Sequence, residues 1–196
     1  MFGLPENSVV GKQLPKTAIY AKFAMNTAER ERFDADISRM SIANVVDKRH
    51  ISEGSKVKSF YLLAVQLKRR EYDPKNIVAL SKLIDQNILF ALIFEEEVQL
   101  ATYCTRLVTS EWQPTEDVTI PLMGLNLDSV WENIVATIGN ITIVGSNSVA
   151  EQIVADDTQA KLMKQIEQLE QRCRTEKQPR KKLELFEKLK ELKKRL

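Results

Sequence analysis

The sequence has few of the residues on which disulfide-bonded folds and metal sites depend. It has two cysteines, Cys104 and Cys173, and their separation offers neither a disulfide framework nor a cysteine cluster for a metal. Its single histidine, His50, excludes a histidine-rich metal site and leaves Ser-His-Asp chemistry dependent on one residue. His50 follows Lys48 and Arg49 in a polar segment, so we expect an exposed loop position for it. Six glycines and six prolines are too few for a linker-rich or collagen-like chain.

Long apolar runs are also missing. No run approaches the roughly 20 residues that a membrane-spanning helix needs, and the segment MFGLPENSVVGKQLPK does not have the charged-then-apolar order of a signal peptide. We therefore expect a reduced, cytoplasmic protein that does not enter a membrane. The chain of 196 residues is 43% apolar, which is too apolar for general disorder and long enough for one globular core with an appendage.

Charge is divided unevenly along the chain. Residues 160–196 contain 13 Lys and Arg against 6 Asp and Glu, a net charge of +7, whereas residues 1–159 have a net charge of −5. This division separates an acidic body from a basic tail, which could contact nucleic acid phosphates or an acidic protein surface, including that of its own body. Because Glu residues interleave with the bases, a plainly solvated helix is the competing interpretation.

The apolar pattern predicts an α+β fold: a mixed, largely antiparallel sheet of about five strands with helices packed on it, then a C-terminal helical hairpin or coiled-coil tail. Segments 56–68 and 88–94 are continuously apolar, as in central strands, and 98–104 alternates. Further strands are expected at 38–47 and 107–112 and a short edge strand at 118–123, while residues 1–15 have the features of an extended arm. The residues expected in the core are Phe60, Leu62, Val65, Leu89, Leu92 and Trp131.

Four helices are predicted in the body from apolar residues at helical spacing. They are expected near 15–25, 26–37, 74–86 and 127–138. Asn26 with Glu29 three residues later is typical of a capping box, and Gly139-Asn140 is a usual helix stop. The apolar face of the third helix comprises Ile77, Leu80, Leu83 and Ile84.

The tail has heptad patterning in two short runs. We divide the chain into a body at 1–145, a hinge at 146–158 and a basic helical-hairpin tail at 159–196. Gln178-Pro179 interrupts the pattern, and Leu183 with Phe186 is expected to widen the second seam. Helices of about two heptads are marginal alone, so each seam needs a surface to cover it. The two predicted seams are Leu162, Ile166, Leu169 and Cys173, and Leu185, Leu189, Leu192 and Leu196.

Basic side chains on the second tail helix are candidate contacts for phosphates, if nucleic acid is the partner. They are Lys181, Lys182, Lys190, Lys193, Lys194 and Arg195.

One segment of the body invites a catalytic hypothesis. Nuclease cores of the restriction-endonuclease type have an acidic residue on one strand. The next strand has three consecutive positions: a carboxylate, any residue, and a lysine. The carboxylates of the two strands together hold Mg²⁺. Here Asp47 is the candidate upstream acid and Lys68 the candidate lysine, but Gln66 occupies the carboxylate position. A neutral amide binds a hard cation weakly, so an ordinary strand end is the favoured interpretation. We expect no cofactor, except Mg²⁺ under the nuclease alternative.

Several stretches in this order resemble a known family. They are MFGLP, VQLKRREYD, LSKLIDQNILFALIFEEEVQLATYCTRLVTSEW, LNLDSVWENIV and the tail IEQLEQRCRTEKQPRKKLELFEKLKELKKRL. Together they resemble an uncharacterised bacterial and archaeal family catalogued as domain of unknown function 4391. The resemblance brings no catalytic residues with it. It implies a context, because genes of such proteins tend to sit beside helicase and DNA methyltransferase genes of restriction-modification or phage-defence clusters.

These observations favour a non-catalytic accessory subunit that docks a larger helicase- or methyltransferase-type partner through its C-terminal helices. Two alternatives remain open at this point. One is an active or degenerate Mg²⁺-dependent nuclease, and the other is a structural protein that associates with itself through the tail.

Overall fold

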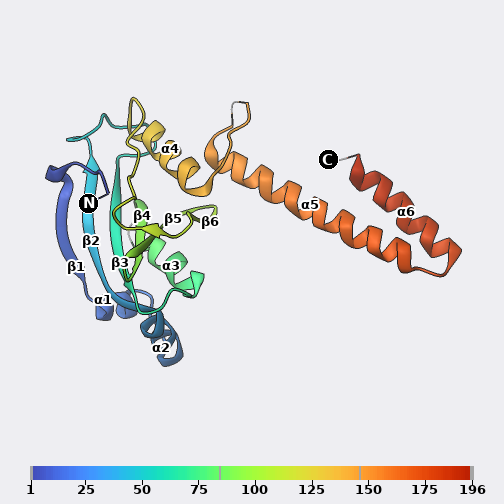
Figure 1. Ribbon diagram of the computed structural model, residues 1–196, viewed down its shortest axis with the longest axis horizontal. Helices are drawn as coiled ribbons and strands as arrows, with labels where there is room; N and C mark the ends of the chain where they lie inside the picture. The colour runs from blue at the N-terminus through green and yellow to red at the C-terminus, as the bar shows by residue number, and fades with distance from the viewer. Residues whose placement is uncertain (1, 84, 146, 195–196) are drawn as a thin grey trace. The chain divides into compact units, whose positions relative to one another are not determined.

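Strand pairing dominates the N-terminal part of the chain, and helix pairing the C-terminal part. The computed structural model describes residues 2–83, 85–145 and 147–194, which form two compact units, Met1–Ile143 and Val144–Leu196 (Figure 1). The first unit contains the helices η1 (Glu6–Ser8), α1 (Lys16–Lys22), α2 (Thr27–Asp36), α3 (Pro74–Ser81) and α4 (Leu127–Gly139). Its strands are β1 (Val9–Leu14), β2 (Ile37–Asp47), β3 (Ser59–Leu67), β4 (Asn87–Phe94), β5 (Glu97–Cys104), β6 (Arg106–Thr109) and β7 (Gln113–Pro114).

The strands form one seven-stranded sheet in the order β1-β2-β3-β4-β5-β6, with β7 paired to β5. Among the described pairs, only β3 with β4 is parallel, and α3 supplies the crossover between these two strands. The predicted mixed, largely antiparallel sheet is thus confirmed, with more strands than the five expected. The added strands include β1, which pairs antiparallel with β2 although an extended arm was expected at residues 1–15.

Helices cover both faces of the sheet. Leu63, Val65 and Phe90 lie in one apolar cluster with residues of α1, α2 and α3. The alternate side chains point the other way, and Phe60 meets Trp131 of α4 with ring centroids 5.6 Å apart. Every residue expected in the core is buried, as the following exposed fractions show: Phe60 0%, Leu62 0%, Val65 0%, Leu89 0%, Leu92 0% and Trp131 8%.

The ends of several helices follow their sequence signals. Asn26 Oδ1 accepts the Glu29 N–H at 3.0 Å while Glu29 Oε2 accepts the Asn26 N–H at 2.9 Å, which confirms the capping box. α4 ends at Gly139, and its C-cap residue Asn140 has a φ of 47°, the left-handed conformation typical of a helix end.

Three local predictions need correction. Residues 118–123 form no strand in the structure, and β7 pairs with β5 instead. α3 ends at Ser81, well before Gln86, and Ile84 lies outside the described residues. His50 is not exposed: 2% of its side chain is accessible.

A single carboxylate ties α4 to the loop between β2 and β3. Asp128 accepts hydrogen bonds from the backbone N–H groups of Ser55, Lys56 and Val57, the shortest at 2.6 Å from Val57. These bonds, led by that of Val57, lower the pKa of Asp128 to about 2. A Cβ on Gly54 would stand 2.1 Å from Asp128 Oδ1, so this close approach requires glycine.

Replacing Asp128 with Asn should therefore change how stability depends on acid. A carboxyl whose pKa is lowered on folding stabilises the fold above its ordinary pKa of 3.8, and that contribution disappears as the pH falls toward about 2. We expect thermal melts of the wild type to fall more steeply between pH 4 and pH 2 than those of Asp128→Asn. Parallel pH profiles would contradict the role given to this clamp.

The second unit contains α5 (Val149–Thr175) and α6 (Pro179–Lys193). The break predicted at Gln178-Pro179 is present, since α5 ends at Thr175 and Pro179 opens α6. The predicted hinge is largely helical instead: α5 begins at Val149, with Ser148 and Glu151 forming its capping box, and Ser146 lies outside the described residues.

Candidate functional site

The residues proposed for a nuclease site do not meet. In the antiparallel pair β2–β3, Asp47 lies opposite Ser59, whereas Ile37 lies opposite Leu67, the residue before Lys68. Asp47 and Lys68 therefore stand at opposite ends of the hairpin, about 30 Å apart at 3.3 Å per residue. Gln66, near Lys68 in sequence, donates from Nε2 to the Ile93 carbonyl at 3.3 Å. The proposed Asp47, Gln66 and Lys68 constellation is not assembled.

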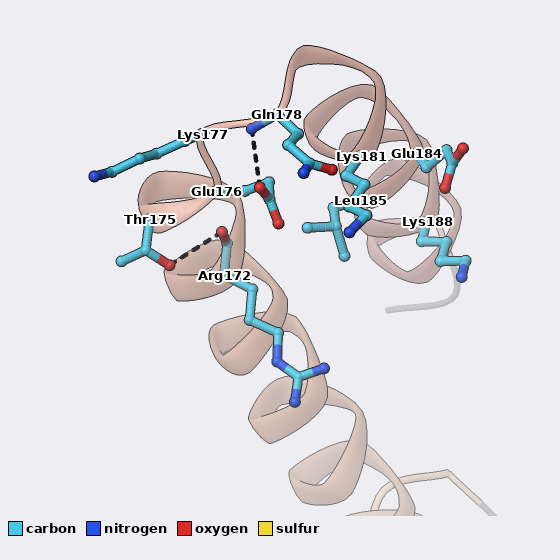
Figure 2. A pocket seen from close by; sticks show the side chains of 9 residues that line it. All are labelled: Arg172, Thr175, Glu176, Lys177, Gln178, Lys181, Glu184, Leu185 and Lys188. Atoms are coloured by element: carbon cyan, nitrogen blue, oxygen red, sulfur yellow. Dashed lines mark hydrogen bonds between the residues drawn. The ribbon is translucent and has the colours of Figure 1, made fainter.

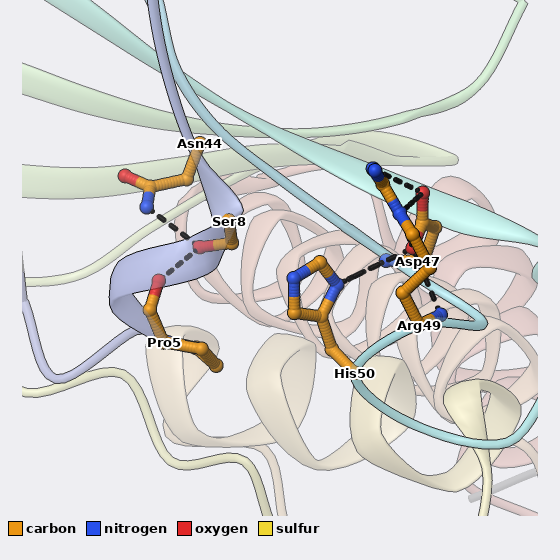
Figure 3. A network of polar contacts seen from close by, with 6 residues as sticks. All are labelled: Pro5, Ser8, Asn44, Asp47, Arg49 and His50. Atoms are coloured by element: carbon orange, nitrogen blue, oxygen red, sulfur yellow. Dashed lines mark hydrogen bonds and ion pairs between the residues drawn. The ribbon is translucent and has the colours of Figure 1, made fainter.

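Asp47 instead belongs to a network at the other end of β2 (Figure 3). Arg49 Nη2 lies 2.8 Å from Asp47 Oδ2, and the Asp47 backbone N–H donates to His50 Nδ1 at 3.3 Å. Hydrogen bonds from Arg49 lower the pKa of Asp47 to about 2, so the carboxylate is ionised at neutral pH. These contacts fix the start of the loop that follows β2. Asp47, Arg49 and His50 therefore have a structural role there.

Lys68 is joined through its backbone to Asp36, an acid that the sequence pattern did not indicate. The Lys68 N–H donates to the Asp36 carbonyl at 2.8 Å. The Asp36 side chain is 1% exposed, pairs with Arg69, and accepts the N–H of Asp73 and the amide of Asn76, both at 2.8 Å. It joins the start of β2 to the start of α3. Because three donors already occupy the Asp36 carboxylate, it stabilises the fold and is not free to bind a metal ion.

Purified protein should accordingly fail to cut DNA. We expect no nicking of supercoiled plasmid with Mg²⁺ or Mn²⁺, because Gln66 is neutral and Asp47 and Lys68 lie at opposite ends of β2–β3. The control is Lys68→Ala, which should behave like the wild type. Robust cleavage by the wild type that Lys68→Ala removes would restore the nuclease alternative.

The tail forms the predicted helical hairpin. Within it, Ile166 is 7% exposed and Leu189 8% exposed, and Lys193 Nζ lies 2.7 Å from Glu170 Oε1 across the two helices. The remaining described seam positions are half-buried, and Leu196 lies outside the described residues. The half-buried positions are Leu162, Leu169, Cys173, Leu185 and Leu192.

Two apolar residues expected in the second seam are exposed instead. Leu183 is 60% exposed and Phe186 58% exposed. Leu183 is turned about 200° around α6 from Leu185, and Phe186 about 100°, at 100° per residue. One partner helix covers only a narrow stripe, so both residues remain on the outside. Being three residues apart, they share one face of α6.

Basic residues surround the turn of the hairpin. An open cleft of about 670 Å³ lies there, with Arg172, Lys177, Lys181 and Lys188 among its lining residues (Figure 2). Glu176 and Glu184 line the same cleft, which makes its charge mixed. Of the candidate phosphate contacts, Lys193 is engaged with Glu170 and Arg195 lies outside the described residues. The other candidates, all exposed, are Lys181, Lys182, Lys190 and Lys194.

The comparisons with known proteins give one match. The family model described as Domain of unknown function (DUF4391) matches residues 2–196. The chain belongs to this family. No curated protein and no solved structure matches it.

In the part of the chain that the structure describes, no helix of the DUF4391 protein is long and apolar enough to cross a membrane. Among those same residues, no three or more His, Cys, Asp or Glu side chains gather where they could hold a metal ion.

Proposed function

We propose that this DUF4391 protein is a non-catalytic accessory subunit of a prokaryotic DNA-processing system, of the restriction or phage-defence kind. It docks a larger helicase- or methyltransferase-type partner through α5 and α6. The observation that carries the proposal is the exposed pair Leu183 and Phe186, which lie outside the seam that buries Ile166 and Leu189. The partner class comes from the resemblance, which implies a genomic setting beside such genes.

The chemistry of this face favours a protein partner over nucleic acid. Leu183 and Phe186 form an apolar centre, and the exposed Lys182 and Lys190 supply a charged rim, which is the pattern of a protein interface. An amphipathic helix that presents anchors at i and i+3 suits an apolar groove. A nucleic acid would pair its phosphates with the lysines, but it would leave the apolar side chains of Leu183 and Phe186 exposed to water.

The decisive experiment compares substitutions that place the same charge on two exposed apolar surfaces. Three tagged full-length proteins are purified separately from the native host: the wild type, the double variant Leu183→Asp/Phe186→Asp, and Leu125→Asp. Leu125 lies in the body and is 94% exposed. We expect a helicase or methyltransferase subunit to be retained by the wild type and by Leu125→Asp, and lost from the double variant. Equal retention by all three proteins would contradict docking through α6.

Salt separates protein docking from phosphate binding. Binding to duplex DNA falls with a log–log slope of about −0.9 per phosphate neutralised. An interface with an apolar centre keeps most of its affinity, because its charges mainly steer association. We expect the complex to survive a salt wash. Light scattering tests the alternative. If the wild type were a dimer and Phe186→Asp a monomer, the Leu183 and Phe186 face would serve self-association and the proposal would be wrong.

A further inference from the structure

A groove crosses one face of the sheet over β1, β2 and β3. Its volume is about 380 Å³, within the range of small-molecule sites. Gly11, Ser41, Ala43 and Ala64 line it with small side chains, so this face is hollow where larger residues would fill it. α4 covers the same face at the other end of β3, where Trp131 meets Phe60. The remaining lining residues are Val9, Gln13, Arg39, Met40, Asn44, Gln66 and Ile93.

Polar side chains with unused hydrogen-bonding capacity converge on this groove. Gln13 lies opposite Ser41 in the β1–β2 pair, and Arg39 lies opposite Gln66 in the β2–β3 pair. Arg39 forms no ion pair with any residue that the structure describes. Gln66 uses its Nε2 on the Ile93 carbonyl, which leaves Oε1 as a free acceptor among the described residues.

Asn44 provides a buried acceptor without a partner. The residue is 1% exposed and donates from Nδ2 to Ser8 Oγ at 2.8 Å, while Ser8 Oγ donates to the Pro5 carbonyl at 2.6 Å (Figure 3). Because the hydroxyl has one proton, it can only accept from Asn44, and this fixes the orientation of the amide. Asn44 Oδ1 finds no donor in the described chain. Asn44 is among the residues that line the groove, so a donor bound there can satisfy this atom.

We propose that this groove binds a small planar ligand with one anionic group and N–H donors, the chemistry of a nucleoside monophosphate. The Arg39 guanidinium suits a single phosphate in bidentate geometry. At 3.3 Å per residue, Arg39 and Asn44 lie about 16 to 17 Å apart along β2, so the cation and the acceptor for N–H groups lie at opposite ends of the groove. The small residues give a flat floor for a ring. The site is independent of the docking face on α6.

The binding test uses the full-length protein with the common nucleoside monophosphates in isothermal titration calorimetry. Inorganic phosphate and the unphosphorylated nucleosides form separate arms, because a general anion site would take phosphate alone. We expect at least one monophosphate to bind with a Kd below about 1 mM, and phosphate or nucleoside alone to bind at least about tenfold more weakly. Failure of every monophosphate to bind, or equal binding of inorganic phosphate, overturns the proposal.

Two variants act on the groove by different routes. Arg39→Ala removes the cation, and Ala64→Leu fills the floor without touching a polar group. Each should weaken binding at least about tenfold, whereas Arg32→Ala, an exposed arginine on α2, should bind like the wild type. Thermal melts confirm that the variants are folded, and if Ala64→Leu fails to fold, Arg39→Ala decides. Unchanged binding by Arg39→Ala places the ligand elsewhere and overturns the assignment.

Discussion

Leu89→Ala is expected to lower the free energy of unfolding by about 2–5 kcal/mol. Leu89 is fully buried in β4, whose neighbours β3 and β5 pair with it along its length. Truncation removes apolar contact and leaves a cavity that packed strands cannot close. Urea denaturation followed by circular dichroism measures the loss as a lower midpoint with an unchanged slope.

The matched control for this prediction is the same substitution at an exposed leucine. Leu125 is 94% exposed, so Leu125→Ala should change the free energy of unfolding by less than about 0.5 kcal/mol. If Leu89→Ala and Leu125→Ala unfolded at the same urea concentration, β4 would not be the centre of the sheet.

The central sheet could be predicted from sequence because its strands are apolar on both faces. β3 and β4 read as continuous apolar runs, and their burial follows from that pattern alone. β1 could not be found this way. Five of its six residues are exposed, and it is a strand because residues 40–44 of β2 pair with it. Long-range pairing of this kind leaves no local pattern in an exposed edge strand.

The candidate nuclease site failed on register as well as on residue type, since Gln66 is not a carboxylate. Asp47 and Lys68 are each the residue that the hypothesis needed, but an antiparallel hairpin brings the end of its second strand to the start of its first. That rule, applied to the predicted strands, would have pointed to Asp36, which precedes β2 and contacts Lys68 through the backbone. Its burial and its bonds to Arg69, Asp73 and Asn76 depend on the fold and carry no sequence signal.

The tail pattern was informative about the seam and misleading about its width. The spacing of 4, 3 and 4 residues identifies the stripe that contains Leu189, which is buried. Leu183 and Phe186 are apolar and close in sequence, yet a two-helix hairpin offers a single partner and cannot cover them. Apolar residues outside the stripe of such a hairpin thereby mark its outward surface, which is where the proposed docking face lies.

Leu189→Asp is expected to open the α5–α6 hairpin. The substitution places a carboxylate in the seam at a position that is 8% exposed, and an unpaired charge buried there costs more than two short helices can offset. Hydrogen exchange should show amide protection in α6 falling to the level of an unfolded segment, while the melting of the body stays unchanged.

The control is Phe186→Asp, which adds the same charge to the same helix at a position that is 58% exposed. It should keep α6 protected yet lose the partner, since the docking face alone is altered. Leu189→Asp should lose both the protection and the partner. Full protection of α6 in Leu189→Asp would mean that the seam around Leu189 does not hold the two helices together.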